Sequence, residues 1–287
     1  LDSDPNCVNQ VVKGRNQQAL YDFAAVVNRT AEHEFAATIS DVFDVRSFLD
    51  YLALKTLIAD QDFVHQYLLY HNAASKRWQM LPWDNNLSFG NSVQALDYGT
   101  AAHPSANAEI NVLQTRLLAV PQYRRYYGER LQELMATLMT PQAVAARVET
   151  ARQQIWFDAV RDIWKPTREN YAVMNASMMA MRTFAEQRNH FVQAALPAYM
   201  PTQSRFLSLN ELMPYNSRTL PDPADRRYDP WFELVNAGLR AVDIGGTYLS
   251  DNRSEPTRFQ IATGTQMAPL GTLLFWGDGQ PQQGNQH

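Results

Sequence analysis

The chain has 287 residues, of which 45% are hydrophobic and 19% charged, and its formal net charge is −4. This composition is sufficient for a hydrophobic core and excludes wholesale disorder. The basic residues form no patch or stripe, which argues against nucleic-acid binding. The single cysteine, Cys7, excludes a disulfide framework and a cysteine-rich zinc site. No stretch has the ~18 apolar residues of a transmembrane helix.

Both ends of the sequence differ from natural protein ends. The first ten residues contain no Met, no basic segment and no apolar run, so they do not form a signal peptide. The last ten residues are polar and typical of a loop. We therefore expect a fragment of a longer protein, with its N-terminal part and any signal peptide missing.

The first 200 residues are predicted to be mainly helical. A helix is expected to begin at Ser40-Asp41 and to continue through an apolar face that ends near Ile58. Two short runs rich in aromatic and aliphatic residues, 63–72 and 77–84, predict a β-hairpin, and residues 88–107 predict a loop. Helices are then expected over 109–119, 122–139, 141–164 and 167–196, with boundaries at Pro121, Pro141, Pro166 and Pro197.

The character of the sequence changes near residue 200. Helical periodicity stops at a linker with Pro197 and Pro201, and short β-type runs follow at spacings near ten residues. This pattern predicts a small all-β sandwich. The chain is thus expected to have an α+β fold with two domains, 1–200 and 201–287.

Carboxylates mark both ends of the predicted hairpin. Asp62, with Asp60 beside it, precedes the first strand, and Asp84 follows the second strand with Asn86 two residues later. A hairpin brings its two ends together, so these groups can share one cleft. Phosphoryl transfer needs one carboxylate to orient the attacking hydroxyl and another to hold Mg²⁺. The spacing alone also fits ordinary aspartates at a helix end and in a turn.

The central segment resembles the core of the CotH-type (spore coat protein H-like) atypical kinases. The similarity rests on Asp62, on the run from His65 to Tyr70 and on the run from Leu81 to Gly90. It implies an atypical protein-kinase-like fold that binds ATP and Mg²⁺. Asp62 matches the catalytic aspartate and Asp84 the metal-binding aspartate, with Asn86 beside it; the remaining matches at the cofactor site are His65, Gln66 and Trp83.

Two positions depart from the family pattern. Gln66 stands where the family has Asn, and Asn86 stands where it has a second Asp. The distance from Asp62 to His65 is also one residue short, which leaves Asp60 as an alternative catalytic residue. The Gly-rich loop and the Lys–Glu pair of a kinase are expected in a missing N-terminal half.

The resemblance implies transfer of the ATP γ-phosphate to Ser or Thr of an exported or envelope protein. The alternative is a non-catalytic pseudokinase that serves as a structural or binding protein of the envelope, coat or matrix. Extracellular or envelope localisation is expected in both cases.

Residues 205–287 resemble a lamin-tail domain, a small immunoglobulin-like β-sandwich. The resemblance rests on the runs 209–212, 231–236, 242–251 and 271–276. It implies an interaction or attachment role, with an interior that contains Phe206, Trp231, Leu234, Leu249, Phe259 and Phe275. The final strands are expected to be missing after residue 287, so the sandwich is predicted to expose an edge or to pair with a strand of a neighbouring chain.

Overall fold

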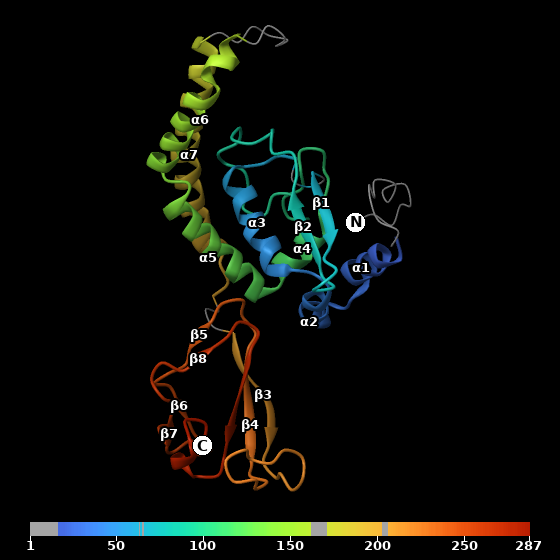
Figure 1. The fold of residues 1–287 in the computed structure, drawn as a ribbon, viewed down its shortest axis with the longest axis vertical. Helices are drawn as coiled ribbons and strands as arrows, with labels where there is room; N and C mark the ends of the chain where they lie inside the picture. Colours follow the sequence, from blue (N-terminus) through green and yellow to red (C-terminus); the bar gives the residue numbers. More distant parts are fainter. Residues whose placement is uncertain (1–16, 63, 65, 162–170, 203–205) are drawn as a thin grey trace. The chain divides into compact units, whose positions relative to one another are not determined.

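A computed structural model describes residues 17–62, 64, 66–161, 171–202 and 206–287. The chain divides into two compact units, residues 1–201 and 202–287. The first unit contains helices and one hairpin, and the second contains short strands, so the α+β class is confirmed. Figure 1 shows the helices and strands of both units.

The first unit begins with three helices and a β-hairpin. These elements are α1 (Gln17–Arg29), α2 (Glu32–Val42), α3 (Val45–Leu57), β1 (Tyr67–His71) and β2 (Trp78–Pro82). The strands β1 and β2 are antiparallel and pair Tyr67 with Pro82, which confirms the predicted hairpin. Ring stacking of Phe23 on Phe43 and Trp78 joins α1, the end of α2 and the hairpin.

The helix α3 starts later than the sequence predicted. Its N-cap is Asp44, whose side chain accepts a hydrogen bond from the Ser47 amide at 3.1 Å. The expected start at Ser40-Asp41 is wrong, because Phe43 adopts an extended conformation and forms a β-bridge with Trp78. This bridge separates α2 from α3 and attaches the hairpin to the start of α3.

Four further helices complete the first unit. They are α4 (Val112–Ala119), α5 (Pro121–Thr137), α6 (Pro141–Arg161) and α7 (Tyr171–Tyr199). The helix α3 packs on α5, and α6 and α7 lie side by side as a long antiparallel pair (Figure 1). Pro121 and Pro141 begin helices as predicted, and Pro166 lies outside the described residues. Pro197 does not end its helix but lies in the last turn of α7, where the missing N–H removes only one backbone bond.

The second unit is built from short strands around one hydrophobic cluster. The strands are β3 (Leu207–Met213), β4 (Trp231–Asn236), β5 (Val242–Asp243), β6 (Tyr248–Leu249), β7 (Phe259–Gln260), β8 (Gln266–Met267) and β9 (Thr272–Trp276). They form a three-stranded antiparallel sheet in the order β3-β4-β9 and the pairs β5-β8 and β6-β7. The immunoglobulin-like topology stays a prediction.

The hydrophobic cluster of the second unit agrees with most of the expected interior. It is formed by Ile244, Ile261, Met267 and Phe275, with Leu234, Leu249 and Phe259 packed against it. Leu207, rather than Phe206, joins the cluster from β3, while Leu209 is 54% exposed. Residues 207–209 pair regularly with β4, and a β-bulge between Leu209 and Glu211 interrupts the register directly afterwards.

Candidate functional site

A buried ion pair closes the C-terminal end of α3. Lys55 Nζ lies 2.5 Å from Asp60 Oδ2, and the two side chains are 2% and 0% exposed. Lys55 lies on the same face of α3 as the apolar residues that pack in the core, and Ala59 turns the chain with a φ of +49°. The turn returns Asp60 to the helix end, where its amide donates to the Lys55 carbonyl at 3.1 Å.

Asp60 joins three segments of the site. Its Oδ1 accepts a hydrogen bond from the Asp62 amide at 2.9 Å, and its Oδ2 accepts one from Ser88 Oγ at 3.4 Å. Its carbonyl accepts a bond from Gln94 Nε2 at 3.0 Å. The Asp60 carboxylate is therefore occupied by structural partners and fixes the backbone of Asp62.

Backbone hydrogen bonds bring the two ends of the hairpin together. The Gln61 amide donates to the Leu87 carbonyl at 3.1 Å, and the Phe89 amide donates to the Ile58 carbonyl at 2.7 Å. The segment after β2 thus returns beside the segment that precedes β1. Tyr67 pairs with Pro82. Gln66, directly before β1, and Trp83, directly after β2, therefore lie at the same end of the hairpin.

The segment after β2 presents polar groups to solvent. Trp83, Asp84 and Asn86 are exposed, and Asp62 is half-buried. Asp84 has a φ of +44°, a conformation that Asp tolerates better than most residues and that is enriched at functional sites. Carboxylate and amide oxygens of this kind are the ligands that Mg²⁺ accepts, together with water and phosphate oxygens.

Tyr51 of α3 lies close to the buried ion pair. Its ring centroid is 5.5 Å from Lys55 Nζ. The pKa of Tyr51 is raised, first by burial and then by the Asp60 carboxylate, while the Trp83 backbone acts in the opposite direction. Tyr51 is therefore un-ionised near neutral pH, and it lies close to both Lys55 and the Trp83 backbone.

Two buried side chains hold the end of α3 against the helices that follow. Arg188 of α7 is fully buried and donates to the Thr56 carbonyl at 2.7 Å and 3.1 Å and to the Gln94 carbonyl at 2.5 Å. Burial lowers the pKa of Arg188 to about 10. Tyr127 of α5 donates to Thr56 Oγ1 at 2.7 Å. The helical tail of the first unit therefore fixes the turn that carries Asp60 and Asp62.

The structure brings the segments that carry the predicted site residues into one region. Gln66 precedes β1 and Trp83 follows β2 at the same end of the hairpin, and Asp62 is one residue from the backbone bond to Leu87. His65 lies outside the described residues. Sequence reasoning missed Lys55 and Arg188, although a lysine on the apolar face of a predicted helix, five residues before Asp60, was a usable signal.

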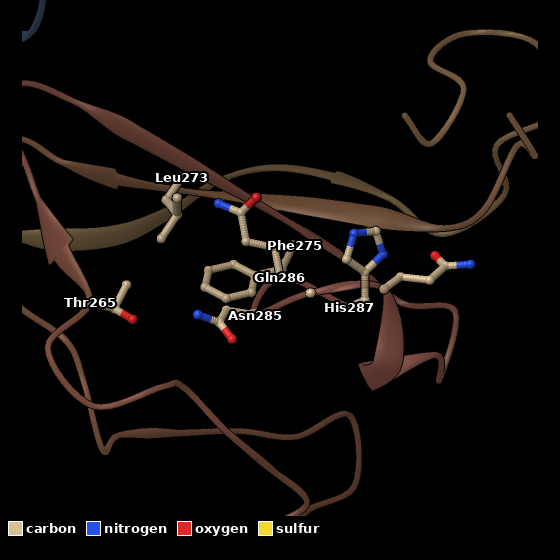
Figure 2. Close-up of a pocket in the computed structure, with 8 residues that line it drawn as sticks. Thr265, Leu273, Phe275, Asn285, Gln286 and His287 are labelled. Carbon is tan, nitrogen blue, oxygen red and sulfur yellow. The ribbon is translucent and has the colours of Figure 1, made fainter. Parts of the chain in front are cut away.

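A pocket of about 380 Å³ belongs to the second unit. Figure 2 shows Thr265, Phe275 and His287 along it. None of the predicted site residues lines this pocket. Over the part of the chain that the structure describes, no helix is both long enough and apolar enough to cross a membrane.

Comparison with known proteins identifies the first unit. The family described as CotH kinase protein matches residues 3–192, about two thirds of the chain. The chain belongs to the CotH kinase protein family. It is similar to the inner spore coat protein H of Bacillus subtilis (strain 168), with 23% identity over 137 residues. That match spans 47% of this chain and 37% of the relative.

The CotH match includes the hairpin and every predicted site residue. It ends within α7, before the second unit begins at residue 202. The resemblance to CotH-like proteins that the central segment indicated is thus confirmed, and the lamin-tail resemblance of the second unit stays a prediction.

Proposed function

We propose that the first unit is the catalytic-loop and metal-binding part of a CotH-like kinase that transfers the γ-phosphate of ATP to Ser or Thr of a protein. The observation that carries this proposal is the pair of backbone hydrogen bonds that join residues 58–61 to residues 87–89. Because of these bonds, the chain enters the hairpin at Asp62 and leaves it through Asp84 in the same region.

Each residue has a separate role in this proposal. Asp62 would accept the proton of the attacking hydroxyl as its oxygen bonds to the γ-phosphorus, while the bond from the γ-phosphorus to the bridging oxygen breaks and ADP leaves. Asp84 would supply the charged ligand for Mg²⁺ and Asn86 a neutral oxygen. Mg²⁺ held there would neutralise charge on the phosphates. Gln66 and Trp83 would contact the nucleotide, and the family resemblance assigns the same role to His65.

The contacts of Asp60 favour Asp62 as the catalytic residue. A general base must reach the proton that it abstracts. Asp60 is 1% exposed and paired with Lys55, whereas Asp62 is half-buried and follows directly in the chain. We therefore assign Asp60 to positioning, through its hydrogen bond to the Asp62 amide.

A pseudokinase is the second candidate, and Asn86 is the observation that favours it. A site with one carboxylate where the family has two holds Mg²⁺ less tightly, because a neutral amide replaces a charged ligand. In this alternative the same scaffold binds a partner in the envelope, coat or matrix without phosphoryl transfer.

We further propose that the protein acts outside the cytoplasm or in the cell envelope, and that the second unit is a lamin-tail-like interaction module. The named location of the Bacillus relative, the inner spore coat, supports an envelope or coat role. The strand β3 is at the edge of its sheet and exposes Leu209 and Leu212, which supports strand pairing with a partner.

Substitution of the two carboxylates in the full-length protein tests the kinase proposal. Asp84→Asn is expected to abolish Mg²⁺-dependent ATP binding, measured by displacement of a fluorescent nucleotide. Asp62→Asn is expected to keep ATP binding and to lower phosphate transfer by ~10²–10⁴-fold, the range for loss of a general base. Asp158→Asn, at an exposed position on α6, is the matched control and should change neither quantity.

Three outcomes are decisive. Normal transfer by Asp62→Asn would refute its catalytic role. Normal Mg²⁺-dependent binding by Asp84→Asn would refute the metal assignment. A wild-type protein that binds no ATP at millimolar Mg²⁺ would establish the pseudokinase alternative.

A further inference from the structure

Several aspartates of the second unit converge at the end of its three-stranded sheet. Asp222, Asp225 and Asp229 lie in the loop between β3 and β4, and Asp278 follows β9. One carboxylate oxygen from each of Asp222, Asp225 and Asp229 lies within 4.8 Å of the other two. A carboxylate oxygen of Asp222, one of Asp278 and a ring nitrogen of His287 likewise lie within 4.8 Å of one another. Asp222 is common to both groups and is therefore the centre of the cluster.

The cluster differs from ordinary acidic surface patches because its centre is buried. Asp222 is 0% exposed, and the side chain of Asp278 is also 0% exposed. Asp222 Oδ1 accepts the Ala224 amide at 2.7 Å, which fixes the orientation of the carboxylate. Burial of a charged carboxylate is unfavourable in free energy unless its oxygens are paired or coordinate a cation.

A second observation is that three oxygens in this region accept no hydrogen bond. Asp222 Oδ2, Asp229 Oδ2 and Gln283 Oε1 are inaccessible to solvent and accept no hydrogen bond from any described residue. The Gln283 side chain reaches the cluster, since its amide donates to Asp225 Oδ2 at 3.3 Å. Buried acceptors without donors are rare in native proteins and indicate a missing water or ion.

Positive charge near the cluster is small. Arg227 Nε lies 3.7 Å from Asp225 Oδ2, but the Arg227 side chain is 72% exposed. The ring of His287 shares a hydrogen bond with Asp278 Oδ2 at 3.1 Å, and its Nδ1 lies 3.2 Å from Asp222 Oδ2 without hydrogen-bond geometry. Among the residues that the structure describes, Arg227 and, when it is protonated, His287 form ion pairs with carboxylates of this cluster.

We propose that this cluster binds Ca²⁺ through Asp222, Asp225, Asp229 and Asp278. Ca²⁺ takes six to eight oxygen ligands in flexible geometry, and carboxylate and amide oxygens are the donors available here. Mg²⁺ fits less well because it demands octahedral geometry and retains several waters. Bound Ca²⁺ would join the loop before β4 to the segment after β9, and so fix that end of the sheet.

Calorimetric titration of the whole chain with CaCl₂ tests this proposal. We expect binding of one Ca²⁺ per chain with a Kd below about 1 mM, the range of extracellular calcium modules or tighter. Asp222→Asn keeps the Oδ1 acceptor for Ala224 and removes the central charge, so it should weaken binding at least about tenfold. Asp251→Asn, an exposed aspartate of the same unit, is the matched control and should bind Ca²⁺ like the wild type.

Thermal unfolding separates metal binding from a structural role. Ca²⁺ should raise the Tm of the wild type and of Asp251→Asn, and should leave the Tm of Asp222→Asn unchanged. Without metal, Asp222→Asn should be at least as stable as the wild type, because it relieves repulsion between carboxylates. The titration and the melts are repeated in Asp84→Asn, so that the kinase site cannot account for the signal.

The proposal is overturned by any of three results. The first is no binding by the wild type at 10 mM Ca²⁺, about tenfold above the weakest expected Kd. The second is wild-type affinity in Asp222→Asn. The third is binding of Zn²⁺ that Ca²⁺ does not displace, which would assign the cluster to the group with His287 instead.

Discussion

Removal of Lys55 should reveal how much the fold depends on the buried ion pair. In Lys55→Met the Asp60 carboxylate remains at 0% exposure and loses the ammonium group 2.5 Å away. Breaking a buried pair by removing one partner costs about 3–5 kcal/mol, because the other charge stays buried without compensation. Lys55→Met should therefore lower the free energy of unfolding of the first unit by this amount.

The double variant Lys55→Met/Asp60→Asn should recover most of that loss. Asparagine keeps the Oδ1 acceptor that holds the Asp62 amide, and it places no charge in the core. Replacement of a buried pair by neutral groups of similar size is often close to neutral. We expect the double variant to be within about 1–2 kcal/mol of the wild type, so that the cycle gives a coupling energy of a few kcal/mol.

Urea unfolding followed by circular dichroism at 222 nm measures these differences, because the described helices of four or more residues all belong to the first unit. With an m-value of about 1–3 kcal/mol/M, a loss of about 3–5 kcal/mol should shift the midpoint by about 1–5 M. Lys76→Met, at an exposed position in the hairpin turn, is the control and should change stability by less than about 0.5 kcal/mol. A cost below about 1 kcal/mol for Lys55→Met, the value of a surface pair, would refute the burial of this ion pair.

Two further predictions concern the buried tyrosines and the boundary between the units. Burial raises the pKa of Tyr127 and of Tyr199, so the unfolded state loses protons above pH 10 while the folded state does not, and stability should fall as the pH rises beyond 10. Exposed tyrosines such as Tyr215 should ionise first, and the last part of the tyrosinate absorbance at 295 nm should appear together with loss of helicity. Complete ionisation of the tyrosines in a fully helical protein would contradict this. Limited proteolysis should cut first near residue 202, and residues 202–287 alone should give a β-type dichroism spectrum. A first cut between β4 and β9, or a helical spectrum, would exclude an independent module.

Local patterns in the sequence were sufficient to predict the hairpin and most helices. The aromatic and aliphatic runs around a small polar turn gave β1 and β2, and Pro121 and Pro141 marked two helix starts. The start of α3 was not predictable in this way, because both Asp41 and Asp44 are suitable caps. The β-bridge between Phe43 and Trp78, which are distant in sequence, selects Asp44.

Local sequence patterns were also insufficient to define the candidate site. The family resemblance placed Asp62 and Asp84 in a known pattern but left Asp60 as an alternative to Asp62. Only the fold shows that Asp60 is buried against Lys55, which is a property of tertiary packing. The aspartate cluster of the second unit was not predictable from local patterns either. Asp222 and Asp278 are 56 positions apart in the sequence, so only the fold brings them together.

The position of Lys55 connects the stability of the first unit to its proposed chemistry. The ion pair fixes Asp60, Asp60 Oδ1 fixes the Asp62 amide, and Gln61 joins that turn to the segment after β2. The Lys55–Asp60 pair is buried and the hydrogen bond from the Asp62 amide is partly buried, so this pair holds the backbone of the residue proposed to accept a proton. The buried pair therefore matters for catalysis through the position of Asp62, because a misplacement of about 1 Å can lower the rate ~10²-fold. On this argument Lys55→Met should lower phosphate transfer even under conditions where it stays folded, whereas the double variant, which keeps the Oδ1 acceptor, should retain more of it.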